Sequence, residues 1–311
     1  MSDLLTHWAV FEDLRRISQH DPLVDPRLAA IMQEEREFAR LGAISRGGSM
    51  FVPHILQNAR QQWDTAADPL LLRRKLAYAL GGVTHFPTDH VLKPLMSELV
   101  QADWNDTQYV MQGRTAKSDV HTDENAIREI SAYYDVHVFR KVYLAGQEEP
   151  FNRFLVAENT TPPGQALSEF VSALFQRTLL ASHTFDPDRQ NLDAWLDNLI
   201  AHVQPLYLDI EIYTRIFAHP DPQKMQQYQV ESAFYLESDP LIRLARALQY
   251  GQPAAPAELE AALAENANRS GYGRTLELGM NALHKTSAFW RGETTEMPDL
   301  KQNYRYIPKK G

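Results

Sequence analysis

A histidine and an aspartate four residues apart are the strongest chemical signal in this sequence. His85 and Asp89 lie in the stretch LAYALGGVTHFPTDH, which spans residues 76–90. On a helix, side chains four residues apart leave the same face about one turn apart. An imidazole nitrogen and a carboxylate oxygen at that spacing could bind one divalent ion. The spacing also suits a histidine that only hydrogen-bonds to an aspartate, so both interpretations stay open.

A second group of histidine and acidic residues follows within residues 119–137. His121 and Glu124 are three residues apart, which is a workable ligand spacing across one helical turn. Glu129 lies two turns beyond His121, roughly 12 Å along a helix axis, so these two residues cannot easily bind one ion. Alternatively, the acidic residues at the start of this stretch complement a helix dipole, and Glu129 faces solvent.

In their order along the chain, these residues resemble the zinc-dependent phospholipase C family, which belongs with the S1/P1-type nucleases. The resemblance covers residues 1–144. The motifs that carry it are His7, the segment RLGAIS at 40–45, the segment LGGVTHFPTD at 80–89, and His121 with its nearby acids. Members of this superfamily are all-α proteins that hold up to three zinc ions, so the resemblance implies a helical bundle with one to three zinc ions.

The resemblance also implies a set of ligands. His7, His85, Asp89 and His121 match family ligands, and Asp89 could bridge two ions. The family's Pro-Asp pair is replaced here by Arg46-Gly47, and its glutamate four residues after the later histidine falls on Asn125. Other residues would then have to supply these two ligands. His54 could replace the missing aspartate of the Pro-Asp pair, and Glu124 or Glu129 could replace the missing glutamate. The predicted metal ligands are therefore His7, His54, His85, Asp89, His121 and Glu124.

Metal-dependent phosphoester hydrolysis is the function that such a site implies. Zinc lowers the pKa of bound water toward ~7 and binds phosphoryl oxygens. Asp89 or Glu129 could orient or deprotonate this water, and we predict these two as catalytic residues. The expected substrate is a phosphodiester or phosphomonoester, such as a phospholipid headgroup. The departures from the family pattern support a different hypothesis, a non-catalytic helical structural or interaction protein with a degenerate metal site.

A competing motif is the dipeptide His20-Asp21. In the HD phosphohydrolases, which are also all-α, such a pair binds metal together with another histidine and aspartate. Here the pair precedes Pro22, in a stretch that predicts a loop rather than a helix. A turn-forming Asp-Pro is therefore the favoured interpretation.

Helices must position these residues, because apolar residues recur at three- and four-residue spacing along most of the chain and alternating patterns are rare. We predict an all-α multi-helix bundle. The expected helices span 4–17, 28–42, 55–66, 69–100, 123–143, 165–183, 191–217, 222–250, 256–268 and 271–290. A loop is expected at 43–53. Gly81 and Gly82 should let another helix approach closely.

The helices suggest a metal-site region at 1–160, a helical extension packed on it at 161–300, and a C-terminal tail at 301–311. A loop with Thr160 and Gly164 could mark the border between the first two. It could equally be a long connection within one continuous domain. The tail could dock on a second subunit, so a homo-oligomer is conceivable.

Composition excludes several classes of protein. Among 311 residues there is no cysteine, which removes disulfides, cysteine-based zinc sites, iron–sulfur clusters and thiol nucleophiles. The formal net charge of −9 argues against nucleic-acid binding through bulk charge. The apolar runs are too short for a membrane span, and the N-terminus does not resemble a signal peptide. We therefore expect a cytoplasmic protein.

Overall fold

The computed structural model describes residues 4–45, 48–102, 120–143, 212–213, 215–216, 219–265, 269–297 and 300, without the side chains of 48–51, 101–102, 120–125 and 143. All regular secondary structure in these ranges is helical, which confirms the predicted all-α class. The phospholipase C type of bundle stays a prediction.

The N-terminal helices are α1 (Leu4–Ser18), α2 (Pro26–Glu34), α3 (Arg36–Ala43), α4 (Gly48–Gln62) and α5 (Pro69–Ala102). They are followed by α6 (Val120–Val138) and the π-helix η1 (Phe139–Tyr143). The C-terminal elements are α10 (Pro222–Gln227), the π-helix η2 (Val230–Phe234), α11 (Pro240–Gln249), α12 (Pro256–Ala264) and α13 (Gly271–Arg291). The expected helices at 165–183 and 191–211 lie outside the described residues.

Three element boundaries differ from the sequence prediction. The expected helix 28–42 is two helices, because Glu35 leaves the helical region at φ −106° and ψ 39°. The predicted 43–53 loop is shorter, since α4 begins at Gly48 and contains Pro53. The expected helix 222–250 is interrupted where Gln229 takes a left-handed φ of 50°. Apolar spacing continues through each break, so periodicity could not reveal it.

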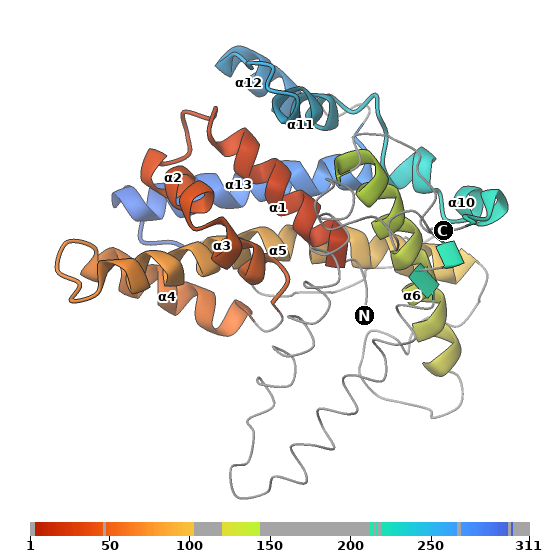
Figure 1. The fold of residues 1–311 in the computed structure, drawn as a ribbon, viewed down its shortest axis with the longest axis horizontal. Helices are drawn as coiled ribbons and strands as arrows, with labels where there is room; N and C mark the ends of the chain where they lie inside the picture. Colours follow the sequence, from red (N-terminus) through yellow and green to blue (C-terminus); the bar gives the residue numbers. More distant parts are fainter. Residues whose placement is uncertain are drawn as a thin grey trace, which may run out of the picture.

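The long helix α5 is the axis on which the other helices pack. It contacts α1, α2, α3, α4, α6 and α13. In Figure 1, α5 runs horizontally with α13 alongside it, and α1 crosses both in projection. Buried side chains from α1 to α6 and from η2 to α13 belong to one hydrophobic core, and α10 adds only the partly buried Met225. Described elements from both predicted regions therefore share a core, while the proposed border near residue 160 lies outside the described residues.

Glycines let α3 and α5 pack backbone against backbone. A Cβ atom on Gly42 would lie 1.9 Å from the carbonyl oxygen of Tyr78, and one on Gly81 would lie 1.8 Å from that of Ala39. A Cβ on Gly82 would lie 2.6 Å from the Val52 side chain of α4. The prediction that Gly81 and Gly82 permit close helix approach is therefore confirmed.

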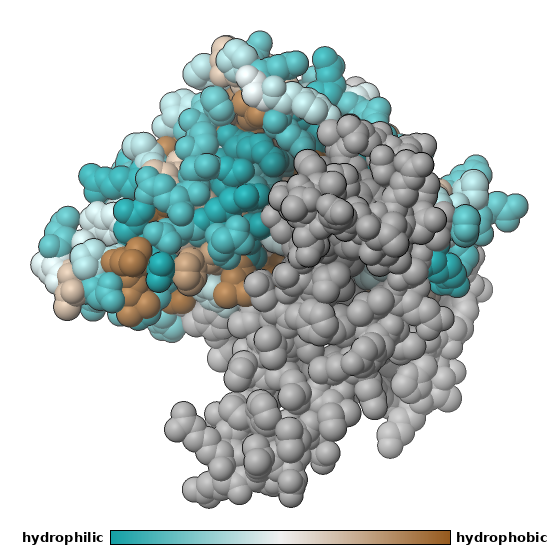
Figure 2. Space-filling model, viewed as in Figure 1, coloured by the Kyte–Doolittle hydropathy of each residue, from teal (hydrophilic) through white to brown (hydrophobic). Residues whose placement is uncertain are grey.

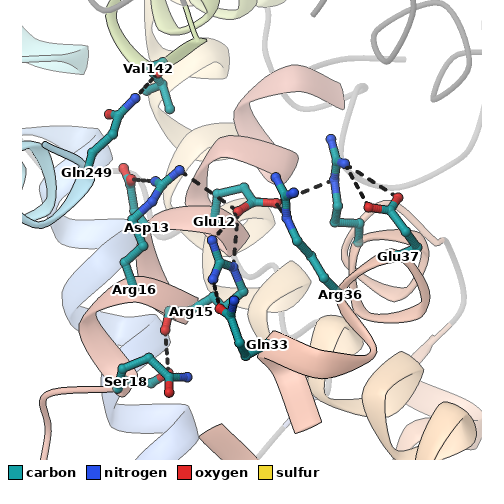
Figure 3. Close-up of polar contacts among 12 residues, drawn as sticks. Glu12, Asp13, Arg15, Arg16, Ser18, Gln33, Arg36, Glu37, Val142 and Gln249 are labelled. Atoms are coloured by element: carbon teal, nitrogen blue, oxygen red, sulfur yellow. Dashed lines mark hydrogen bonds and ion pairs between the residues drawn. The ribbon is translucent and has the colours of Figure 1, made fainter. Parts of the chain in front are cut away.

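Charged side chains hold α1 against α3 and α11. Figure 3 shows Glu12 surrounded by arginines, with Asp13 beside it. Glu12 is fully buried and contacts Arg15 and Arg36, at 2.9 Å and 2.7 Å. Figure 2 shows that this face of the molecule is largely hydrophilic around α1, with smaller hydrophobic areas toward α4.

Candidate metal centre

Two histidines and an aspartate meet where α1 crosses α5. His7 comes from α1, and His85 and Asp89 come from α5. The Nε2 atom of His7 lies 3.2 Å from Oδ1 of Asp89, and the Nε2 atom of His85 lies 3.4 Å from Oδ2. The two imidazole rings stack with their centroids 4.3 Å apart. All three side chains are buried, with exposed fractions of 6% or less.

A backbone carbonyl determines the tautomer of His85. The Nδ1 atom of His85 lies 2.9 Å from the carbonyl oxygen of Ala43, the last residue of α3. Because a carbonyl can only accept, Nδ1 must carry the proton. Nε2, which faces Asp89, is then the ring nitrogen that can bind a cation when His85 is neutral. Metal-binding histidines commonly donate their second nitrogen to a backbone carbonyl in this way.

Burial and mutual charge shift the pKa values of this group. Burial lowers the pKa of His85, and the neighbouring His7 lowers it further. Burial alone would raise the pKa of Asp89, but the contacts with His7 and His85 outweigh it and hold that pKa well below the usual range. Asp89 is therefore an ionised carboxylate facing two imidazoles, which is a donor set of mixed nitrogen and oxygen atoms.

Lys93 is a further partner of Asp89. It lies one turn further along α5, and its Nζ contacts Oδ2 of Asp89, the oxygen that also faces His85. The Lys93 side chain is 39% exposed, so its ammonium group lies between the buried group and the surface. Sequence reasoning missed Lys93, although its four-residue spacing from Asp89 was a readable signal.

The three side chains fit a divalent metal ion. Their candidate ligand atoms lie within 4.8 Å of one another. A tetrahedral ion with bonds of about 2.0–2.1 Å separates neighbouring ligand atoms by roughly 3.3 Å, which is close to the two histidine–aspartate distances. Three protein ligands with an open position are typical of catalytic zinc sites. Two buried imidazoles and one carboxylate thus form a donor set that could hold a divalent ion.

Two predicted site residues lie elsewhere. His54 is exposed on α4, whereas Val52, two residues earlier, is buried against Gly82. Residues two apart on a helix point about 200° apart, so His54 faces away from α5. The carboxylate of Glu129 instead contacts Lys224 and the Tyr228 hydroxyl, at 2.5 Å and 2.9 Å. Within the described residues, neither belongs to the metal-competent group.

The predicted ligands His121 and Glu124 lie in the first turns of α6. Their side chains lie outside the described residues, so their participation stays a prediction. The structure therefore brings together His7, His85 and Asp89 of the predicted set.

The HD alternative is not favoured by the geometry. His20 is exposed, whereas Asp21 is buried and contacts His284 of α13 at 2.6 Å. Asp21 also accepts a hydrogen bond from the Leu23 backbone N–H, as expected for a turn-forming aspartate. Asp21 therefore links the α1–α2 connection to α13.

A cavity of about 820 Å³ lies between α11 and α12. Its lining mixes cationic, acidic and apolar side chains, including Arg243, Glu258 and Ile242. His7, His85 and Asp89 do not line it, so this cavity is separate from the candidate metal centre.

Comparisons with known proteins add no assignment. No family model matches the chain, and no curated protein or solved structure matches it. No helix in the described ranges combines the length and apolar character needed to cross a membrane.

Proposed function

We propose that this protein is a zinc-dependent phosphoesterase whose metal centre contains His7, His85 and Asp89. The observation that carries the proposal is the convergence of two buried imidazoles and one buried carboxylate from two crossing helices. His121 and Glu124, at the start of α6, are the proposed additional ligands. His121 matches the later histidine of the phospholipase C pattern, and Glu124 is the proposed substitute for the family's glutamate, whose place is taken by Asn125.

The residues of the site have distinct roles in this proposal. His7 and His85 hold the ion through Nε2, and the Ala43 carbonyl keeps His85 in the required tautomer. Asp89 supplies the negative charge and orients the attacking water. When bound, zinc supplies Lewis acidity toward the phosphoryl group and acidifies the water.

Lys93 supports the choice of a phosphate ester as substrate. Its partly exposed ammonium group lies next to Asp89, at the outer side of the buried group. An ammonium group is a suitable partner for phosphate oxygens. We therefore propose that Lys93 helps to bind the phosphoryl group of the substrate.

Metal analysis of the purified protein tests the proposal. We expect about one or more equivalents of zinc in the wild type and a large loss in His85→Gln, because a ligand is removed. His54→Gln is the matched control, since His54 is exposed on α4, and it should keep the metal. Chromogenic phosphate monoesters and diesters should be hydrolysed by the wild type but not by His85→Gln.

Two results would contradict the proposal. Less than about a tenth of an equivalent of metal, with no activity gained on adding zinc, would favour a structural network of His7, His85, Asp89 and Lys93. Equal metal content in His85→Gln and the wild type would contradict the ligand assignment. In the first case the helical structural or interaction protein is the better account.

A further inference from the structure

The first turn of α1 is held by an aspartate from a distant part of the chain. Asp135 of α6 is fully buried. Its carboxylate accepts hydrogen bonds from the backbone N–H groups of Leu5 and Thr6, at 3.1 Å and 2.8 Å, and from the Thr6 hydroxyl at 2.6 Å. The first N–H groups of a helix have no partner within the helix, so Asp135 provides the capping that a local residue usually supplies.

His7 directly follows the two residues that Asp135 binds. We propose that Asp135 is a positioning residue for the metal centre, which fixes the first turn of α1 so that the His7 imidazole meets Asp89. This proposal rests on the proposed function. His7 is the one member of the described group that comes from α1, so fraying of this turn would move His7 without moving His85 or Asp89.

The ionised state of Asp135 is essential to this arrangement. A fourth donor, the hydroxyl of Tyr213, lies 2.6 Å from Oδ2. All four described groups donate, and only a carboxylate can accept from all of them with two oxygens. An asparagine of the same shape would turn an N–H group toward at least one of these donors. Through this hydrogen bond, Tyr213, from the second half of the chain, contacts the residue that holds the first turn of α1.

A matched residue separates positioning from general stability. Asp239 is equally buried and also accepts four hydrogen bonds: from Leu241 N–H, from the Arg269 guanidinium, and from the N–H and hydroxyl of Ser270. It caps α11 and joins the start of α13, and it is not in the metal-competent group. Asp135→Asn and Asp239→Asn therefore impose the same chemical change at two helix ends, only one of which carries a proposed ligand.

Zinc titration calorimetry on the full-length protein, well below the unfolding temperature of each variant, tests the proposal. We expect Asp135→Asn to weaken zinc binding about tenfold or more, the scale seen when a residue supporting a ligand is lost. Asp239→Asn should bind zinc as the wild type does, even where it loses as much thermal stability. With saturating cobalt chloride, Asp135→Asn should also show the weakened visible absorption of His7→Gln, because both lose one imidazole ligand.

The outcomes distinguish this proposal from the proposed function. Wild-type zinc affinity in Asp135→Asn overturns the positioning role alone, as do equal losses in Asp135→Asn and Asp239→Asn. A wild type that binds neither zinc nor cobalt overturns both proposals. If Asp135→Asn does not fold, Thr6→Val removes one donor and keeps the others; it should still weaken zinc binding measurably, and an unchanged affinity overturns the proposal.

Discussion

Lys93 and a metal ion would compete for the same carboxylate. The Lys93 ammonium contacts Oδ2 of Asp89, and His85 Nε2 faces that oxygen. A salt bridge between Asp89 and Lys93 lowers the free energy of the metal-free protein, and any ion that binds Asp89 must weaken it. Lys93 thus limits metal affinity even if it also helps to bind a phosphate.

Replacing Lys93 with methionine should therefore strengthen zinc binding. We expect a few-fold lower dissociation constant, equivalent to ~1 kcal/mol, because the competing ion pair is partly exposed. Lys75→Met, an exposed position on the same helix, should leave zinc affinity unchanged. Calorimetric titration would measure both. Weaker binding in Lys93→Met would mean that the lysine supports the site rather than competes for it.

His137 should make the stability of the protein depend on pH. Burial lowers its pKa to about 4, with the charges of Lys141 and Arg140 acting in the same direction. An unfolded histidine has a pKa of about 6.5, so the unfolded chain binds the extra proton as the pH falls below that value. The stabilisation by neutral His137 is thus present above pH ~6.5 and is lost toward pH ~4.

Urea unfolding at pH 7.5 and pH 5 would measure this contribution. We expect the free energy of unfolding to fall by roughly 2 kcal/mol more in the wild type than in His137→Gln, which cannot titrate. The difference between the two proteins removes the contributions of other groups. If the free energy of unfolding falls equally in both proteins, His137 takes up its proton in the folded protein at pH 5 as readily as in the unfolded chain.

At the scale of elements, the contact between α3 and α5 controls the site. The Ala43 carbonyl that binds His85 ends α3, directly after Gly42. Because Gly42 and Gly81 allow the two backbones to touch, this carbonyl comes within hydrogen-bond distance of a side chain on α5. Close helix packing therefore determines the tautomer of a proposed ligand.

Gly42→Ala should destabilise the fold and loosen the metal centre together. The new Cβ would meet a backbone carbonyl, which cannot rotate away, so we expect a loss of about 3 kcal/mol and weaker zinc binding. In Gly279→Ala the new Cβ would mainly meet the end of the Leu14 side chain, which can move, so the loss should be smaller. Urea unfolding and zinc titration of both variants would check this. Equal losses of stability would contradict the backbone explanation.

At the scale of the whole molecule, buried charges join elements that are far apart in the sequence. Glu12 contacts arginines of α1 and α3 (Figure 3). Asp13 contacts Arg246 of α11 and accepts a hydrogen bond from Tyr272 of α13. Burial would raise the pKa of Glu12, but the charges of Arg36 and Arg15 outweigh it and lower that pKa. These contacts thus join α3, α11 and α13 to α1, which carries His7.

Glu12→Gln should destabilise the protein strongly. Removing this charge leaves neighbouring arginines without their buried partner, and breaking such a pair costs about 3 kcal/mol. Glu34→Gln removes a surface partner of Arg73, with the glutamate 56% exposed, and should cost less than ~1 kcal/mol. Urea unfolding of both variants would measure the difference. Similar decreases in the free energy of unfolding of the two variants would show that the buried ion pairs of Glu12 stabilise the fold no more than a surface ion pair does.

The sequence alone predicted the helical class and the core of the site. Helical periodicity does not depend on distant contacts, and neither does the one-turn spacing of His85 and Asp89, because both follow from the geometry of a single helix. Family resemblance added His7, which lies 78 positions before His85 and has no local signal that links them. It also suggested His54, which the structure places on an exposed helix face.

Only the tertiary structure decided how the site is held. Ala43 contributes a backbone carbonyl, a group that every residue possesses, so its role depends on the glycine-mediated approach of α3 to α5. Asp135 caps a helix that lies 129 positions earlier in the chain, where capping patterns, which are local, could not point to it. Side chains reveal what chemistry is available, whereas the packing of distant helices determines which of them meet.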